Sequence, residues 1–196
     1  MRSRSCVFCC LLPGVLVFSV SWATAGPFDG WSYRTPIQLN NATGAATLVD
    51  FPVLVTLDSG SFDFGKAATN GADLRFASAS GAALSYEIEK WDSAARTAAV
   101  WVKVPQIDVS SSIGLIHMYT GNAAALDAQN AADVWSNGYV GTWHLGATLN
   151  DSTAFNNDGT ASGTVTTTTG IAGDARLFNL GSIRSPEVSN GSLDMA

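Results

Sequence analysis

The sequence predicts an all-β fold in which one β-sandwich is followed by the incomplete start of a second sandwich. Short segments alternate between apolar and polar residues with the period of two that a half-buried strand requires. Turn-forming dipeptides separate these segments. From residue 151 onward the chain is rich in Asn, Asp, Gly, Ser and Thr, with only short apolar stretches. That composition suits short strands joined by long turns.

Six segments before residue 122 are predicted to be strands. In the segment 84–91, Tyr86 and Ile88 face one way and Glu87 and Glu89 the other. The segment 99–104 repeats this pattern, and 113–119 is apolar on both faces, which is typical of a central strand. The predicted strands are residues 31–37, 51–57, 73–77, 84–91, 99–104 and 113–119, with turns at Asn70-Gly71, Ser80-Gly81 and Gly121-Asn122.

Two features refine this pattern. Pro52 cannot donate a ladder hydrogen bond, so it indicates a strand start or an edge strand. Residues 122–135 are rich in alanine, and their spacing fits a short helix or a compact loop that closes the first domain. We therefore expect a β-sandwich domain over residues 26–137 and a second, truncated domain over 138–196.

Residues 1–25 have the layout of a secretory signal peptide. Arg2 and Arg4 form a cationic head, residues 6–22 are uncharged and apolar, and Ala23-Thr24-Ala25 is a small-residue cleavage site. An uncleaved membrane anchor is the rival interpretation, although about 17 apolar residues are marginal for crossing a bilayer of ~30 Å. We expect cleavage after Ala25 and export to the periplasm, the cell surface or the extracellular space, with no membrane span in the mature chain.

Removal of this segment changes the composition of the protein. All three cysteines, Cys6, Cys9 and Cys10, lie within it, so a mature chain would contain no disulfide, thiolate metal site or cysteine nucleophile. The mature chain would keep 8 Lys and Arg against 16 Asp and Glu, a net charge of −8. Without a basic cluster, nucleic acid and anionic membranes are poor candidate partners.

Several blocks in order resemble a family of bacterial exported proteins, the domain of unknown function family 2341. The blocks are Trp31-Ser32-Tyr33-Arg34-Thr35-Pro36-Ile37, Gly71-Ala72-Asp73-Leu74-Arg75-Phe76, Tyr86-Glu87-Ile88-Glu89-Lys90-Trp91-Asp92, Val100-Trp101-Val102-Lys103-Val104-Pro105 and Tyr119-Thr120-Gly121-Asn122. This resemblance covers about residues 29–135. Some similar proteins continue into a proton channel of the Tol/Exb type, which implies an envelope transport component as an alternative function.

The chain after residue 138 resembles the opening of a laminin-G-like, concanavalin-A-like jelly roll. The blocks that carry this resemblance are Trp143-His144-Leu145, Asp151-Ser152-Thr153, Asn156-Asn157-Asp158-Gly159-Thr160 and Gly173-Asp174-Ala175-Arg176-Leu177-Phe178. A domain of that kind needs roughly 150 residues, whereas about 58 follow Gly138. We therefore expect a fragment, and a Ca²⁺ site would require the complete second domain.

Glu87, Glu89 and Asp92 are the sharpest candidates for chemistry. Carboxylates two residues apart on a strand share one face, about 6.5–7 Å apart at the backbone, and a retaining glycosidase needs two nearby carboxylates. The spacing resembles the Glu-x-Asp-x-x-Glu signature of jelly-roll glucanases, but Glu89 stands where that family has Asp and Asp92 where it has Glu. The alternative is a solvated strand face opposite Tyr86 and Ile88, and this is the interpretation we favour.

The remaining candidates are aromatic residues and turn carboxylates. Trp91, Trp101 and Trp143 could stack against sugars, although such residues more often fill a sandwich core. Asp151 and Asp158 could bind calcium, but Asp in such a segment more often caps its own backbone. The two histidines, His117 and His144, are expected to be structural and cannot form a multi-histidine metal site.

From these features we expect a non-catalytic extracytoplasmic binding or interaction module without a cofactor. Its ligand would be a glycan or a cell-envelope protein. The transport component follows from the family resemblance alone, and a glycoside hydrolase is the third possibility.

Overall fold

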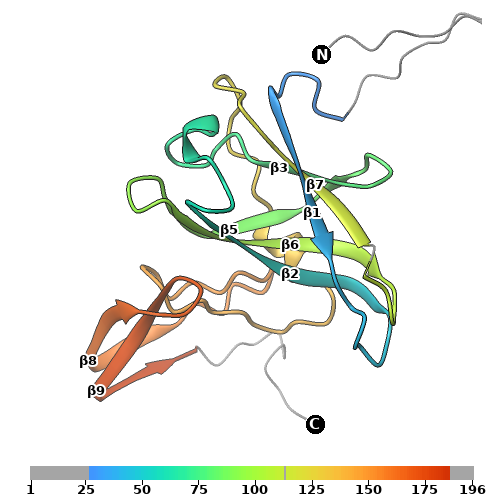
Figure 1. Cartoon of the computed structure of the whole chain (residues 1–196). Helices are drawn as coiled ribbons and strands as arrows, with labels where there is room; N and C mark the ends of the chain where they lie inside the picture. Colours follow the sequence, from blue (N-terminus) through green and yellow to red (C-terminus); the bar gives the residue numbers. More distant parts are fainter. Residues whose placement is uncertain (1–26, 113, 186–196) are drawn as a thin grey trace, which may run out of the picture.

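The computed structural model describes residues 27–112 and 114–185. The predicted signal peptide lies outside these residues. Two antiparallel sheets pack face to face as a β-sandwich (Figure 1). The first sheet has the order β1 (Tyr33–Leu39), β7 (Gly114–Thr120), β3 (Arg75–Ser78), β4 (Ala83–Leu84). The second has the order β2 (Leu48–Asp58), β6 (Thr97–Ile107), β5 (Tyr86–Asp92).

The core lies between the sheets and is built by the predicted alternation. On β6, Val100 and Val102 are fully buried and face Phe76 and Met118 of the first sheet within one apolar cluster. Tyr86 on β5 joins them at 1% exposure. Burying an aliphatic side chain of this kind contributes about 1.5–3 kcal/mol relative to leaving it exposed, so this cluster stabilises the sandwich.

Two of the predictions concern strand position, and both are confirmed. The apolar segment 113–119 corresponds to β7, which pairs with β1 on one side and β3 on the other. Pro52 lies within β2, which pairs with β6 alone among the described strands. An edge strand tolerates proline because one side of its backbone faces no neighbour.

A buried carboxylate ties two loops at one end of the sandwich. The side chain of Asp73, 1% exposed as a residue, accepts hydrogen bonds from the backbone N–H groups of Ala68 at 2.8 Å, Gly121 at 2.7 Å and Asn122 at 3.2 Å. Gly121 has a φ of +89°, a conformation that glycine adopts without strain. Asp73 therefore joins the turn before β3 to the turn after β7.

The alanine-rich segment contains a loop and one helical turn, α1 (Ala131–Val134), which is the short helix or compact loop that the sequence predicts. Asn130 caps this turn by accepting the N–H of Asp133. A short 3-10 helix, η1 (Phe64–Lys66), lies between β2 and β3. Within the described residues, no helix is long and apolar enough to cross a bilayer.

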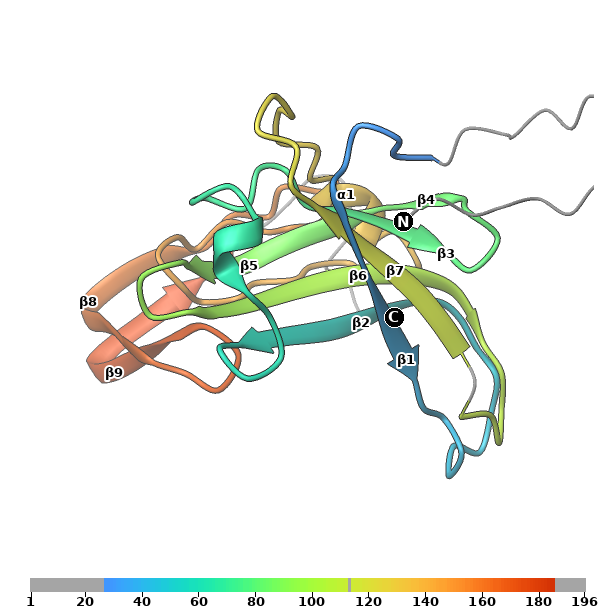
Figure 2. The same ribbon diagram turned by 45° about the horizontal axis from the view of Figure 1, so that its top comes forward.

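After Gly138 the chain forms two further structures. Residues 139–158, which we name the strap, have no regular secondary structure and lie over the outer face of the second sheet. Strands β8 (Thr160–Thr169) and β9 (Asp174–Arg184) then form a hairpin that extends beyond one end of the sandwich (Figures 1 and 2). The hairpin is mostly exposed, including Leu177 and Phe178.

Candidate functional site

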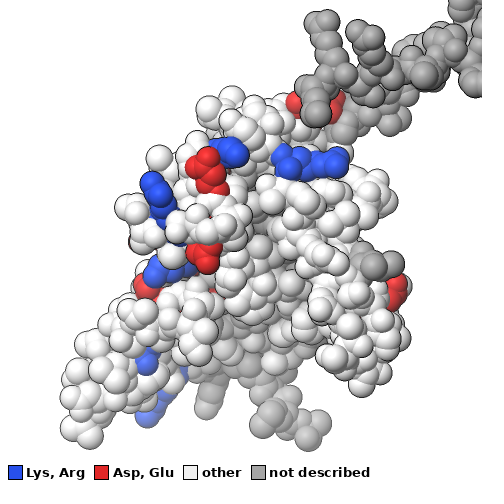
Figure 3. Space-filling model, viewed as in Figure 1, with Lys and Arg blue, Asp and Glu red and all other residues white. Residues whose placement is uncertain are grey.

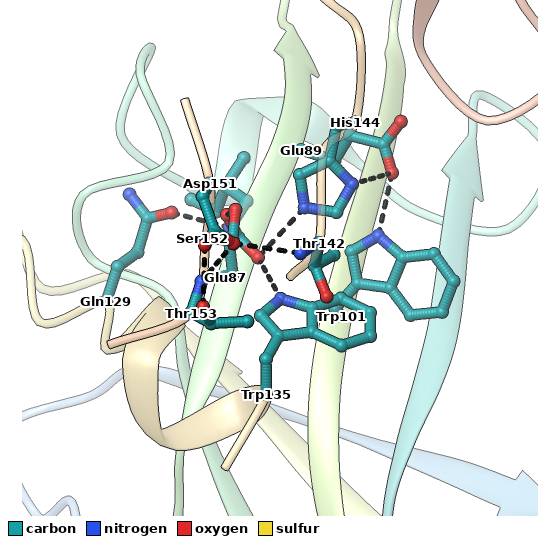
Figure 4. Close-up of polar contacts among 11 residues, drawn as sticks. Glu87, Glu89, Trp101, Gln129, Trp135, Thr142, His144, Asp151, Ser152 and Thr153 are labelled. Carbon is teal, nitrogen blue, oxygen red and sulfur yellow. Dashed lines mark hydrogen bonds and ion pairs between the residues drawn. The ribbon is translucent and has the colours of Figure 1, made fainter. Parts of the chain in front are cut away.

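The outer face of β5 carries the two candidate glutamates. Because Tyr86 and Ile88 point into the sandwich, Glu87 and Glu89 project outward, toward the strap (Figure 4). The pairing of β5 with β6 shifts register between Ile88 and Lys90, which leaves Glu89 at a β-bulge. Bulges commonly redirect a side chain beside a functional site.

His144 of the strap lies between the two carboxylates. Its Nε2 is 3.0 Å from Oε2 of Glu87, and its Nδ1 is 3.3 Å from Oε2 of Glu89. Both ring nitrogens therefore meet an acceptor, an arrangement that only the doubly protonated imidazolium satisfies fully. We name Glu87, Glu89 and His144 the clasp.

Electrostatics in the clasp favours the charged form of all three groups. Burial alone would lower the pKa of His144, but hydrogen bonds and charge attraction from Glu87 and Glu89 outweigh it and raise that pKa from 6.5 to about 9. Burial would raise the pKa of Glu87, yet hydrogen bonds from His144, Ser152 and Trp135 hold it below its usual value. The hydrogen bond from His144 likewise lowers the pKa of Glu89.

Neutral donors also hydrogen-bond to both carboxylates. For Glu87, the indole Nε1 of Trp135 donates to Oε2 at 2.6 Å, and the hydroxyl of Ser152 donates to Oε1 at 2.6 Å. For Glu89, the indole Nε1 of Trp101 donates to Oε2 at 2.7 Å. The Trp101 ring also stacks on the imidazole of His144, with their centroids 6.2 Å apart.

These contacts correct the expectation that Glu87 and Glu89 solvate an open strand face. Their side chains are only 13% and 9% exposed. The physical reason is that the strap covers this face and supplies donors to carboxylates that would otherwise be costly to bury. The residues beyond 138 were expected to form a separate domain, so no segment was expected to pack on this face of β5.

A second buried carboxylate folds the strap itself. Asp151 accepts the backbone N–H groups of Thr142 at 2.8 Å, Thr153 at 3.0 Å and Asn157 at 3.0 Å. Burial would raise the pKa of Asp151, but these hydrogen bonds hold it below its usual value. Asp158 in turn accepts the N–H of Asp151 at 2.9 Å. The structure thus shows both calcium candidates engaged in backbone capping.

The other candidates are distributed over separate parts of the molecule. Trp91 packs against Phe62 and Phe64 at the edge of the core. The indole of Trp143 donates to the carbonyl of Asn157 at 2.9 Å within the strap. Asp92 accepts the N–H of Ala95 in the turn after β5. Of the three tryptophans that the sequence singled out, Trp101 is the one that contacts the clasp.

A pocket of about 450 Å³ lies beside the clasp. Its walls are β5, the start of α1 and the strap, and it is lined by Glu87, Glu89, His144, Ala131, Ala132, Thr148, Asn150, Ser152 and Asn156, among others. Across residues 27–112 and 114–185, no group of three or more His, Cys, Asp or Glu side chains could hold a metal ion.

Charge on the face seen in Figure 3 is sparse and mixed. Lys and Arg lie interspersed with Asp and Glu, most of the visible surface carries neither, and no large basic patch gathers there. Lys103 is paired with Asp133 of α1 at 3.2 Å and also donates to the hydroxyl of Ser136. This pair ties the helical turn to the same face of β6 that Trp101 occupies.

Sequence reasoning missed Trp135, His144 and Ser152 as partners of the glutamates. His144 stands 57 residues from Glu87, and Ser152 stands 65 residues away, so no local spacing links them. Two carboxylates need nearby donors only if their face is covered, and the sequence does not show that it is.

Residues 70–158 match the model of the family described as "Domain of unknown function (DUF2341)". Over this segment the chain is similar to that family. The match confirms the family resemblance seen in the sequence. It also runs past residue 138 and includes the strap, so the family's segment contains every member of the clasp. No curated protein and no solved structure shows significant similarity to the chain.

Proposed function

We propose that the protein is a non-catalytic extracytoplasmic binding module whose ligand is a glycan or another protein of the cell envelope. One observation carries the proposal: the two carboxylates of β5 are held by fixed internal partners. Glu87 Oε2 accepts from both Trp135 and His144, and Glu89 Oε2 accepts from both Trp101 and His144.

This arrangement is unsuited to glycoside hydrolysis. A retaining or inverting glycosidase keeps one carboxylic acid protonated near neutral pH, which requires a raised pKa. Both clasp glutamates have lowered pKa values instead, so neither holds a proton to donate. Ser152 is likewise poorly placed as a nucleophile, since its hydroxyl donates to Glu87 and not to the imidazole of His144.

The binding part of the proposal is supported by the pocket and by the sequence. The pocket beside the clasp has a volume within the range of about 300–1,000 Å³ that small-molecule sites occupy. Export is proposed from the signal-peptide layout of residues 1–25. We also propose that residues 138–196 contain the start of a laminin-G-like or concanavalin-A-like module, on the resemblance given above.

The test combines a hydrolysis assay with a binding assay. The exported protein is incubated with β-glucans and galactans, and new reducing ends are measured, with sedimentation on insoluble polysaccharide and purified peptidoglycan in parallel. We expect retention on one of these materials without hydrolysis. Hydrolysis that disappears in Glu87→Gln but persists in the control Asp92→Asn would contradict the non-catalytic assignment, and absence of retention on every material would contradict the binding assignment to glycans.

A further inference from the structure

We propose that the pocket between β5, α1 and the strap binds a neutral carbohydrate through Thr148 and Asn150. This inference rests on the proposed function, and it names both the site and the class of ligand.

Most of the polar groups nearest the clasp are already engaged, and a few are not. Ser152 donates to Glu87, and Thr153 donates to Asp151. In contrast, the side chains of Thr148 and Asn150 line the pocket, are exposed, and make no hydrogen bond within the described part of the chain.

These side chains can form hydrogen bonds with the hydroxyl groups of a sugar. An amide and a hydroxyl side chain each both donate and accept, as a sugar hydroxyl does. Ala131 and Ala132 line the pocket on the α1 side, where they offer small apolar surface to the C–H groups of a ring. A few polar groups that fix orientation within partly apolar walls are the usual composition of a small-ligand site.

The charge of the lining separates neutral ligands from charged ones. Glu87, Glu89 and Asp151 are negative and His144 is positive, so the lining carries a net negative charge that repels anionic sugars. A calcium ion needs about six to eight oxygen ligands. The carboxylate oxygens of Glu87 and Asp151 already accept hydrogen bonds from donors within the protein. A neutral, hydroxyl-rich ligand fits the pocket best.

The experiment measures binding of defined oligosaccharides to the exported protein by saturation-transfer NMR. The probes are tetrasaccharides of the cello, xylo, malto, galacto and chito series, with an oligogalacturonate as the anionic comparison. We expect at least one neutral probe to bind and the anionic probe to bind at least tenfold more weakly. Binding of the anionic probe alone, or of no neutral probe, would overturn the proposal.

Matched variants locate the site. Thr148→Val and Asn150→Ala together should weaken binding about tenfold, since each removes one hydrogen-bonding group. Thr168→Val and Asn179→Ala make the same chemical changes at exposed positions of the β8–β9 hairpin and should change binding less than twofold. Equal loss in both pairs, or in neither, would place the ligand elsewhere.

The outcomes also separate this inference from the proposed function. If a neutral probe binds in the pocket and is hydrolysed, the carbohydrate site is confirmed and the non-catalytic assignment is wrong. If no probe binds in the pocket but the protein is retained on peptidoglycan, the proposed binding function is supported and the assignment of this pocket is wrong.

Discussion

The clasp should make the stability of the protein fall as the pH rises from neutral to alkaline. His144 is charged and paired with two glutamates in the folded state, but it is an ordinary histidine in the unfolded chain. Because folding raises the pKa of His144 from 6.5 to about 9, its contribution is fully present below pH 6.5. That contribution is lost as the pH rises through about 9.

The magnitude follows from the size of this rise. Each pKa unit corresponds to about 1.4 kcal/mol, so the free energy of unfolding should fall by about 3 kcal/mol between about pH 6 and pH 9.5. The side chain of His144 is 18% exposed, so solvent screens this interaction little. The lowered pKa values of Glu87 and Glu89 have the opposite pH dependence. Their contribution to the free energy of unfolding is present above pH 4.5 and is lost only in more acidic solution.

Urea unfolding of the wild type and of His144→Gln, at several values between about pH 6 and pH 9.5, checks this prediction. The range stops there because burial raises the pKa of Tyr86 above 10. In more alkaline solution, ionisation of this tyrosine would also change the free energy of unfolding. The variant should lose the alkaline fall in stability, whereas the control His117→Gln should keep it. A wild type whose stability stays constant over this range, or a His144→Gln variant with the same fall as the wild type, would refute the reasoning.

Three further outcomes are expected. Trp135→Phe removes the indole donor to Glu87 and should cost about 1–2 kcal/mol in urea unfolding; an unchanged midpoint would contradict this. Asp73→Ala leaves three backbone N–H groups without their acceptor and should cost about 3 kcal/mol or more, so a loss below about 1 kcal/mol would argue against its role. A chain ended after residue 137 should melt at a lower temperature than one ended after 158, because it lacks the strap, and equal melting would show that the strap is not required.

Much of the sandwich could be predicted because the alternation of apolar and polar residues along a segment indicates which face of a strand is buried. Val100 and Val102 occupy every second position of one segment, and a strand places such positions on one face. That pattern located the core side of β6 and the outward direction of Trp101 without knowledge of the neighbouring strands. The edge position of β2 could likewise be predicted from Pro52, since proline's missing donor is a local property.

The turn chemistry of the strap was also partly predictable. Asp151 and Asp158 were expected to cap nearby backbone more readily than to bind metal, and the structure has both engaged in that way. Such bonds join residues a few positions apart, so the sequence alone contains both partners. The same local logic predicted a short helix or a compact loop in residues 122–135.

The clasp was decided by the tertiary structure alone. The sequence presents Glu87 and Glu89 as polar residues alternating with apolar ones, and a solvated face and a covered face have the same alternation. What separates the two cases is whether another segment supplies donors, and His144 and Ser152 come from a part of the chain more than 55 residues away. Local periodicity specifies which side of a strand faces the core, whereas the partner of the opposite side depends on contacts between distant segments, and these form only when the whole chain packs.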